Sequence, residues 1–216
     1  MDLLEFRKKE STNNTSIRHP WEQARLAFLK KLISRYIYLP QKSVVIDIGC
    51  GDTYVIENLA KENPDSLFYA VDIAFTDELL KKYQENLTLK NIFLFQTLDD
   101  ISGLSQIKSS LVILSDVIEH IKDDKEFLTE LLRKNCFNSK TFFLITVPAF
   151  QSLFCSHDVF LGHYRRYTNT LLKKNLSEAG LNVIQSGYFL FSLLVVRLFQ
   201  VVKEKFWGVK KENMTT

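Results

Sequence analysis

The sequence has few of the residues that build disulfide scaffolds, flexible linkers or metal centres. Its 216 residues include three cysteines, four prolines and seven glycines, with no internal repeat and no segment rich in proline, glycine and serine. Cys50, Cys136 and Cys155 form no CxxC pair and no spacing typical of zinc ligands, so we expect a reducing, cytoplasmic setting and no metal. The first ten residues carry charges throughout and contain no apolar segment typical of a signal peptide.

Long apolar runs and an excess of one charge are also missing. Lys and Arg number 28 against 25 Asp and Glu, and this net charge of +3 does not by itself indicate nucleic-acid binding. Basic and aromatic residues do not alternate along a stripe, so we expect no nucleic-acid partner. Residues 179–196 carry no charge, but polar residues and Gly187 interrupt them and Arg197 follows, which argues against a membrane-spanning helix.

Short apolar segments alternate with amphipathic segments through most of the chain. Strands are expected at 44–46, 67–71, 92–95, 111–114, 141–147 and 182–186. Helices are expected from Trp21 to Pro40 and at 54–61, 77–86, 123–135, 169–179 and 189–206. Strands that are apolar throughout predict a parallel sheet covered on both faces. The expected fold is α/β, a doubly wound, mostly parallel, Rossmann-like sheet of six or seven strands with helices on both faces.

The composition changes mainly near the two ends of the chain. We predict a flexible arm over 1–18, a lid helix over 19–40, a core domain over 41–187, and an apolar and basic helix with a tail over 188–216. Two interpretations of the last segment remain open. It packs on the sheet or at a homodimer interface, or it lies on a membrane surface and brings a peripheral enzyme to a lipid-linked substrate.

The residues after the first two expected strands form a ligand-binding pattern. Asp47 is followed by Gly49 and Gly51, so the backbone can turn tightly and approach a ligand closely. Asp72 follows the second strand, where an acid can bond the hydroxyls of a ribose. A dinucleotide-binding loop would have a third glycine where Tyr54 stands, and Asp47 would repel a pyrophosphate but suit an ammonium group. The plainer alternatives are a tight strand-to-helix turn and a solvated aspartate.

Together these residues resemble the motifs of class I S-adenosylmethionine-dependent methyltransferases, in the small-molecule, type 11/23-like branch. The resemblance covers residues 44–188, including the sequence LSDVIEHI at 114–121 and TVP at 146–148. It implies methyl transfer from S-adenosylmethionine to a small-molecule acceptor, with S-adenosylhomocysteine as product. The chain departs from the pattern at Thr53, which replaces a glycine, and shows no clear seventh strand, unless a short one lies near Trp207.

The resemblance also implies which residues bind the cofactor. In the family the glycine loop holds the methionine part, the acid after the second strand holds the ribose, and the loop after the third strand surrounds the adenine. The residues expected in these roles, or in a lid over them, are Asp47, Gly49, Cys50, Gly51, Asp72, Ile73, Thr97, Leu98, Ser115, Asp116, Trp21 and Arg25. For Trp21 and Arg25 the alternatives are a helix–sheet contact and a surface position.

Residues 156–168 read SHDVFLGHYRRYT and form the most distinctive segment. It resembles a segment of methyltransferases from cell-envelope, lipid-glycan and secondary-metabolite pathways. His157 and His163 are the candidate bases that take a proton from the acceptor. The residues expected to bind the acceptor are Tyr164, Arg165, Arg166 and Tyr167. Alternatively, Asp158 pairs with an arginine and simply orders the loop.

These observations predict an enzyme that methylates a hydroxyl or carboxyl oxygen. Candidate bases are present, whereas the Asp/Asn-Pro-Pro-Tyr motif of enzymes that methylate amino groups of nucleic-acid bases is absent. Two alternatives remain: a methyltransferase-like module that binds the cofactor and works through a partner, and a nicotinamide-binding Rossmann domain.

Overall fold

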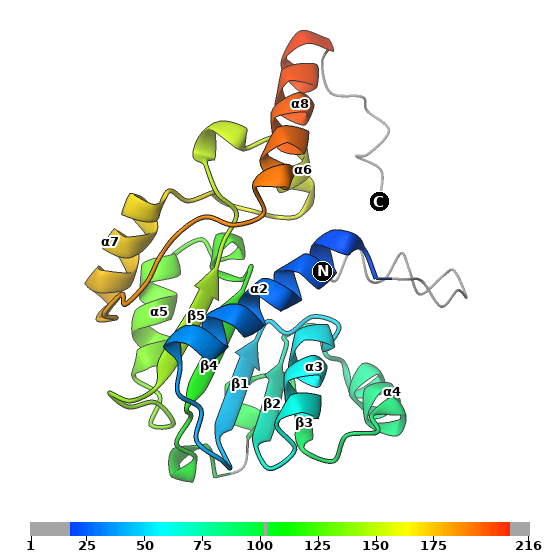
Figure 1. Ribbon diagram of the computed structural model, residues 1–216, viewed down its shortest axis with the longest axis vertical. Coiled ribbons are helices and arrows are strands. Elements are labelled where there is room, and N and C mark those ends of the chain that lie inside the picture. The colour runs from blue at the N-terminus through cyan, green and yellow to red at the C-terminus, as the bar shows by residue number, and fades with distance from the viewer. Residues whose placement is uncertain (1–17, 102, 208–216) are drawn as a thin grey trace. The chain divides into compact units, whose positions relative to one another are not determined.

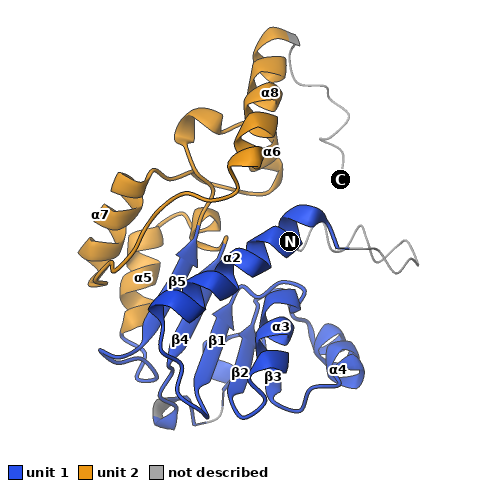
Figure 2. Cartoon of the chain, in the orientation of Figure 1, with its two compact units in different colours: residues 1–115, 133–146 blue, residues 116–132, 147–216 orange. Residues whose placement is uncertain are grey.

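The computed structural model describes residues 18–101 and 103–207 (Figure 1). The chain divides into two compact units (Figure 2). The first unit comprises residues 1–115 and 133–146, and the second comprises residues 116–132 and 147–216. The boundaries predicted at residues 18, 40 and 187 stay predictions, and the arm over 1–17 and the tail from 208 lie outside the described residues.

The first unit contains a parallel sheet with β1 at its centre. The strands are β1 (Val44–Ile48), β2 (Leu67–Val71), β3 (Ile92–Phe95), β4 (Leu111–Ser115) and β5 (Phe142–Thr146). They lie in the order β3-β2-β1-β4-β5, and every neighbouring pair is parallel. The chain therefore builds outward from β1 to β3 and then returns to the other side of β1. Ligands of such sheets bind beyond the carboxyl ends of the strands at this reversal.

The first unit contains three helices, which form in the segments where the sequence predicted them. They are α2 (Pro20–Tyr36), α3 (Tyr54–Glu62) and α4 (Asp77–Asn86). α2 begins with a capping box, because the His19 side chain accepts from the Trp21 amide and Glu22 accepts from the His19 amide. Figure 1 shows α2 crossing one face of the strands, and Leu29 of α2 packs in one core with residues of α3 and the sheet.

Both faces of the central strands are buried. Val45 and Ile113 belong to the core that includes α2 and α3. Ile46 and Val112 point to the opposite face and are also fully buried. This continuous burial explains why β1 and β4 are apolar on both sides.

The second unit is helical and contains a buried polar connection. Its helices are α5 (Asp124–Leu132), α6 (Ser156–Phe160), α7 (Asn169–Ala179) and α8 (Phe191–Trp207). Asp124 at the start of α5 accepts hydrogen bonds from the Tyr167 hydroxyl at 2.7 Å and from the Asn175 side chain at 2.9 Å. α7 ends at Gly180, which has a φ of 104°. The short 3₁₀ turns of the two units are η1 (Leu98–Asp100), η2 (Leu104–Gln106), η3 (Ile118–His120) and η4 (Gln151–Leu153).

The prediction of an α/β fold with a parallel sheet is confirmed, but the predicted number of strands is wrong. Among the described residues the sheet has five strands, not six or seven. Residues 182–186 form no strand, and Ile184 is 67% exposed, so burial does not hold this segment on a sheet edge. Trp207 ends helix α8 and forms no seventh strand. None of the helices in the described segments combines the length and apolar character that crossing a bilayer requires.

Candidate functional site

The glycine turn after β1 folds as its sequence predicts. Gly49, Gly51 and Thr53 have φ angles of 72°, 58° and 63°. The Gly49 amide donates to the carbonyl of Val71 at 2.7 Å, which ties the turn to the end of β2. Thr53 replaces the third glycine of the family pattern, so a β-branched residue adopts the left-handed conformation here. Such strained residues concentrate at ligand sites and switches.

Asp72 is joined to the glycine turn. Its Oδ2 accepts from the Gly51 amide at 2.8 Å, and its Oδ1 accepts from the Ala74 amide at 3.0 Å. These contacts fix a carboxylate beside the turn, where the sequence places a ribose-binding acid. Ile73 next to it is 83% exposed, which leaves an apolar side chain open to solvent at the same sheet edge.

Asp47 is the acid that directly precedes the glycine turn. Its side chain is buried and its Oδ1 has no hydrogen-bond partner. Burial raises the pKa of Asp47 to about 7; Arg25 opposes this rise and Asp72 adds to it. A buried carboxyl oxygen without a hydrogen-bond partner lowers stability, so an acid of this kind at a strand end fits a site for a cationic ligand.

Arg25 connects α2 with the ends of β4 and β5. Its guanidinium donates to Ser115 Oγ, with Nη2 at 2.5 Å and Nε at 3.2 Å. Ser115 Oγ and Thr146 Oγ1 share a further hydrogen bond of 3.0 Å. Arg25 is only 8% exposed, so the alternative of a surface position is wrong, and its guanidinium lies 5.9 Å from the centre of the Trp21 ring. Whether these two residues touch the cofactor stays a prediction.

Sequence reasoning missed the contact between the start of α2 and the glycine turn. Arg18 forms an ion pair with Asp52, and its guanidinium lies 4.4 Å from the centre of the Tyr54 ring. The only signal was a basic residue just before the helix and an acid inside the turn. Nothing in the sequence pairs these two positions.

Thr97 and Leu98, predicted to bind the adenine, lie at the start of η1. The Thr97 amide and hydroxyl both donate to Asp100, at 2.7 and 2.9 Å. Leu98 is buried, and its carbonyl accepts from the Ile101 amide at 3.3 Å; whether Thr97 and Leu98 touch an adenine stays a prediction. Burial also raises the pKa of the Cys50 thiol, which fits a packing role for this side chain.

In the second unit Asp158 organises the distinctive segment. This fully buried carboxylate accepts hydrogen bonds from Arg166 Nε at 2.8 Å, from the Cys155 amide at 3.0 Å and from His163 Nδ1 at 2.9 Å. Burial opposes ionisation, but the hydrogen bonds from His163 and Arg166 lower the pKa of Asp158 below its usual range. Because an ionised carboxylate only accepts, Nδ1 of His163 carries a proton, and in the neutral imidazole Nε2 is then the acceptor.

The other residues predicted to contact the acceptor, Tyr164, Arg165 and Tyr167, differ in how far they are buried. Arg165 Nη1 lies 2.9 Å from Asp124 Oδ1, and Tyr167 is 1% exposed with its hydroxyl on the same acid. Burial and Asp124 raise the pKa of Tyr167 well above its usual value. These contacts give both residues a structural role, while Tyr164 is 54% exposed. Their contact with an acceptor stays a prediction.

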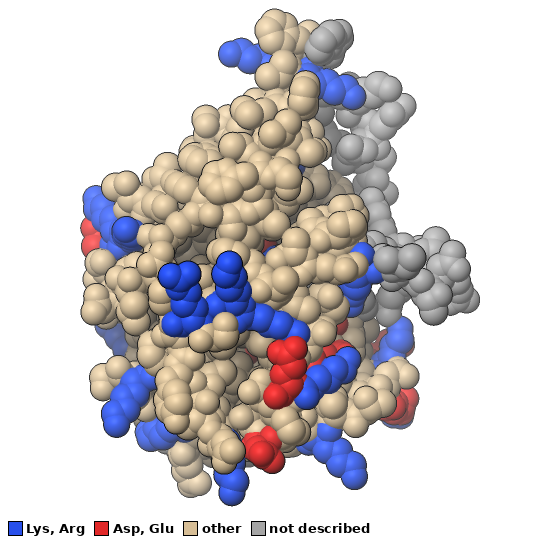
Figure 3. Space-filling view, viewed as in Figure 1, with Lys and Arg blue, Asp and Glu red and all other residues tan. Residues whose placement is uncertain are grey.

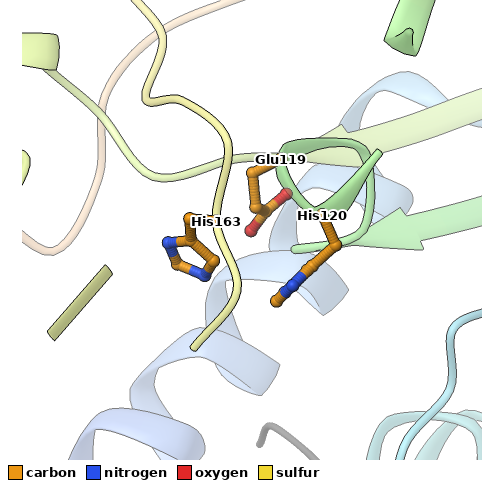
Figure 4. Close-up of side chains that lie close together, drawn as sticks. All are labelled: Glu119, His120 and His163. Carbon is orange, nitrogen blue, oxygen red and sulfur yellow. The ribbon is translucent and has the colours of Figure 1, made fainter. Parts of the chain in front are cut away.

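The two candidate bases do not lie in the same surroundings. His157 on α6 has its ring centre 6.5 Å from that of Phe160. His163 instead lies beside Glu119 and His120 (Figure 4), with the His120 and His163 ring centres 4.7 Å apart. Glu119 and His120 are not among the predicted site residues. LSDVIEHI was the only sequence signal for them.

Asp116 starts the segment that leads to these two residues. It has a φ of 56°, an unusual value for a residue other than glycine, and its side chain is half-buried. Its predicted contact with the cofactor stays a prediction.

A family model described as a methyltransferase domain matches residues 21–186. The chain belongs to this methyltransferase family. The match covers α2, the whole sheet and the Asp158 segment. The activity class is therefore methyl transfer with S-adenosylmethionine as the family's methyl donor. No curated protein matches the chain.

Three solved structures share the fold of this chain. A presumed methyltransferase from Bacillus halodurans has a TM-score of 0.58 and 16% identity, covering 88% of this chain and 87% of its own. The YcgJ protein from Bacillus subtilis also has a TM-score of 0.58, with 14% identity over 88% of this chain and 86% of its own. A mycolic acid cyclopropane synthase, solved with S-adenosylhomocysteine, has a TM-score of 0.57 and 12% identity over 77% of this chain and 64% of its own.

Proposed function

We propose that this methyltransferase binds S-adenosylmethionine at the carboxyl ends of β1 and β2 and methylates an oxygen of a small-molecule acceptor. The observation that carries the proposal is the Asp47 carboxyl, which is buried, lacks a partner at Oδ1 and directly precedes the glycine turn. The ammonium group of the cofactor's methionine part would add a positive charge beside this carboxyl and supply the donor that its Oδ1 lacks. When bound, S-adenosylmethionine would supply the methyl group, which is attached to its positively charged sulfur.

The other cofactor contacts follow from the same edge of the sheet. Asp72, held by the Gly51 amide, would accept from the ribose hydroxyls, as acids at this position do in related sheets. The exposed side chain of Ile73 would pack against the adenine, and Thr97 and the backbone of Leu98 would bond its edge. The further members of the proposed site are Gly49, Cys50, Ser115, Asp116, Trp21 and Arg25.

The segment around Asp158 is proposed to receive the acceptor. Methyl transfer to oxygen needs an aligned acceptor and a group that takes its proton, and positioning contributes roughly 7–11 kcal/mol in such reactions. His157 and His163 are the candidate bases, and Nε2 of His163 is available because Asp158 holds its Nδ1 proton. Resemblance of this segment to enzymes of cell-envelope and secondary-metabolite pathways supports a hydroxylated or carboxylated acceptor.

Titration calorimetry with S-adenosylhomocysteine tests the cofactor assignment, with NADH as the control ligand. Micromolar binding of S-adenosylhomocysteine alone supports the proposal. Asp47→Asn should weaken that binding about 10- to 100-fold, since a charge-assisted hydrogen bond contributes about 1.5–3 kcal/mol. The matched variant Asp65→Asn changes an exposed acid in the turn before β2 and should bind like the unaltered protein. Equal binding by all three proteins would overturn the assignment of Asp47.

The methylated atom can be identified by the stability of the product. The enzyme is incubated with S-adenosylmethionine labelled in its methyl group and with panels of hydroxylated, carboxylated and amino acceptors. A methyl ester releases labelled methanol in mild alkali, whereas a methyl ether keeps its label. Label on oxygen supports the proposal, and label confined to nitrogen or carbon overturns it.

We further propose that α8 binds the surface of an anionic membrane. Six of its exposed apolar side chains recur at three- and four-residue steps and form one stripe: Phe191, Val195, Leu198, Phe199, Val202 and Phe206. Val196 is also exposed but lies beside the stripe. The opposite side of the helix contacts the same unit, where Glu204 accepts from the amide and hydroxyl of Ser156. Lys203 and Lys205 are exposed and flank the stripe, and Figure 3 shows basic side chains near this end of α8 above a largely uncharged surface.

Vesicle sedimentation tests this surface. Binding to vesicles with an anionic lipid, and weaker binding to neutral vesicles, is expected because lysines near a membrane contribute about 1 kcal/mol each. Lys203→Gln combined with Lys205→Gln should reduce the binding, and Lys81→Gln combined with Lys82→Gln on α4 should not. Concentration-dependent dimerisation without vesicle binding would overturn the proposal in favour of a homodimer interface.

A further inference from the structure

Two segments of the second unit bring three metal-ligating side chains together. Glu119 and His120 come from η3, and His163 follows α6. Each offers one ligand atom, and these atoms lie within 4.8 Å of one another (Figure 4). We propose that Glu119, His120 and His163 bind one divalent transition-metal ion of the zinc class. This departs from the expectation of no metal that was based on cysteine and histidine spacing.

The donor set suits such an ion. Two imidazoles and one carboxylate form a common three-residue set in catalytic zinc sites, while Mg²⁺ and Ca²⁺ prefer oxygen ligands alone. Ligand atoms around a tetrahedral zinc ion lie about 3.3 Å apart, given zinc–nitrogen distances of about 2.0–2.1 Å. The ligand atoms all lie within 4.8 Å of one another, so a bound ion would draw the most widely separated of them closer together.

Asp158 orients His163 as a carboxylate orients a metal-bound histidine. Nδ1 of His163 lies 2.9 Å from Asp158 Oδ1, so Nε2 on the other edge of the ring remains for a ligand bond. Metal-binding histidines usually donate their second ring N–H to a carboxylate in this way. Arg166 and the Cys155 amide hold the same carboxylate, so the ring orientation is fixed without an ion.

A backbone hydrogen bond joins the two ligand-bearing segments, because the Tyr164 amide donates to the carbonyl of Glu119 at 2.8 Å. Within the later segment, the His163 amide donates to the carbonyl of Asp158 at 2.9 Å. Glu119 is fully buried and the His163 side chain is 8% exposed. The ligands thus sit on a restrained framework that loses little conformational freedom when an ion binds.

The simpler interpretation is ring packing alone. His120 and His163 meet edge to face, with an interplanar angle of 80° and ring centres 4.7 Å apart. That contact involves only the two rings, whereas a metal ion would also engage the fully buried Glu119 carboxylate. A metal ion accounts for all three side chains.

Three protein ligands leave a coordination position for an oxygen from outside the protein. Assigning that position to the methyl acceptor rests on the proposed function. With the acceptor in that position, His163 would be a metal ligand and His157 would remain the candidate base. The metal site itself does not depend on this assignment.

Titration of the metal-free protein with Co²⁺ tests the site, because Co²⁺ substitutes for Zn²⁺ and its visible absorption reports coordination. We expect one equivalent to bind with micromolar affinity or better, with the intense bands of four- or five-coordinate Co²⁺, and Zn²⁺ to displace it. Glu119→Gln, His120→Gln and His163→Gln should each weaken binding by about 100-fold or more, and Asp158→Asn by about 10- to 100-fold. His157→Gln provides the matched control and should change the affinity less than twofold.

Three results would overturn the inference: binding weaker than millimolar, the weak absorption of six-coordinate Co²⁺, or equal loss of binding in His157→Gln. The spectrum of the unaltered protein does not depend on any variant folding correctly. S-adenosylhomocysteine titrations of the same samples separate the two proposals. If the protein binds S-adenosylhomocysteine but no metal ion, the metal site alone is overturned. If it binds the metal ion but not S-adenosylhomocysteine, the cofactor assignment alone is overturned.

Discussion

Replacing Asp47 by asparagine should stabilise the ligand-free protein, and the gain should grow with pH. Burial raises the pKa of this carboxyl from 3.8 to about 7. The folded state therefore disfavours the ionised form, so the free energy of unfolding falls as pH rises from about 4 to about 7 and then levels off. The asparagine side chain would carry no charge and would remove this loss.

The size of the effect follows from the two pKa values. Each pKa unit corresponds to 1.36 kcal/mol, so full ionisation of Asp47 costs about 4 kcal/mol. At pH 5 the carboxyl is mostly protonated in the folded state, and the cost is smaller. The stability gain of Asp47→Asn should be about 2.5 kcal/mol larger at pH 8 than at pH 5.

Urea unfolding of the two proteins at pH 5 and pH 8 measures this difference. Asp65→Asn changes an exposed acid and should show no such pH-dependent gain. Affinity supplies a second readout, because S-adenosylhomocysteine should bind the unaltered protein about tenfold more weakly at pH 6 than at pH 8 if its ammonium requires ionised Asp47. A constant difference in stability between Asp47→Asn and the unaltered protein would refute the claim that Asp47 is poised near neutral pH.

Three further outcomes can be measured on the same protein. Tyr167→Phe removes the 2.7 Å hydrogen bond to Asp124 and should lower the free energy of unfolding by about 1–3 kcal/mol, whereas Tyr164→Phe at an exposed position should change it by less than about 0.5 kcal/mol in urea titrations. Asp72→Asn should weaken S-adenosylhomocysteine about tenfold in calorimetry, by removing a charged acceptor of ribose hydroxyls. Cys50 is buried and its thiol pKa is raised, so it should react with a thiol reagent only after unfolding, and rapid labelling of the native protein would contradict the packing role.

The sequence predicted the five strands of the sheet because each of them contains a short, continuously apolar run. Parallel pairing then brings the ends of neighbouring strands to one edge, which is why Asp47 and Asp72 could be placed near the glycine turn before the structure was known. The expected strand at 182–186 failed for a physical reason. Its apolar residues are interrupted by polar ones, and Ile184 remains exposed.

The contacts around His163 could not be predicted in the same way. Glu119 and His120 form part of a recognised strand-end motif, but nothing in their spacing indicates that a histidine from a later segment lies beside them. The pairing of Arg18 with Asp52 could not be predicted either, because no sequence spacing links these two positions. Periodicity shows which face of an element is buried, whereas these pairs depend on how loops return to the strand ends.

The hydrogen bonds that the Asp158 carboxylate accepts affect how residues 155–166 move. The three donors to this carboxylate come from residues 155, 163 and 166, all within eight residues of it along the chain. Such short-range closure lets the segment open and close as one cooperative unit while the rest of the protein stays folded. The amide hydrogens of Cys155, Asp158 and His163 should therefore exchange with solvent at a common rate, and that rate should rise sharply in Asp158→Asn.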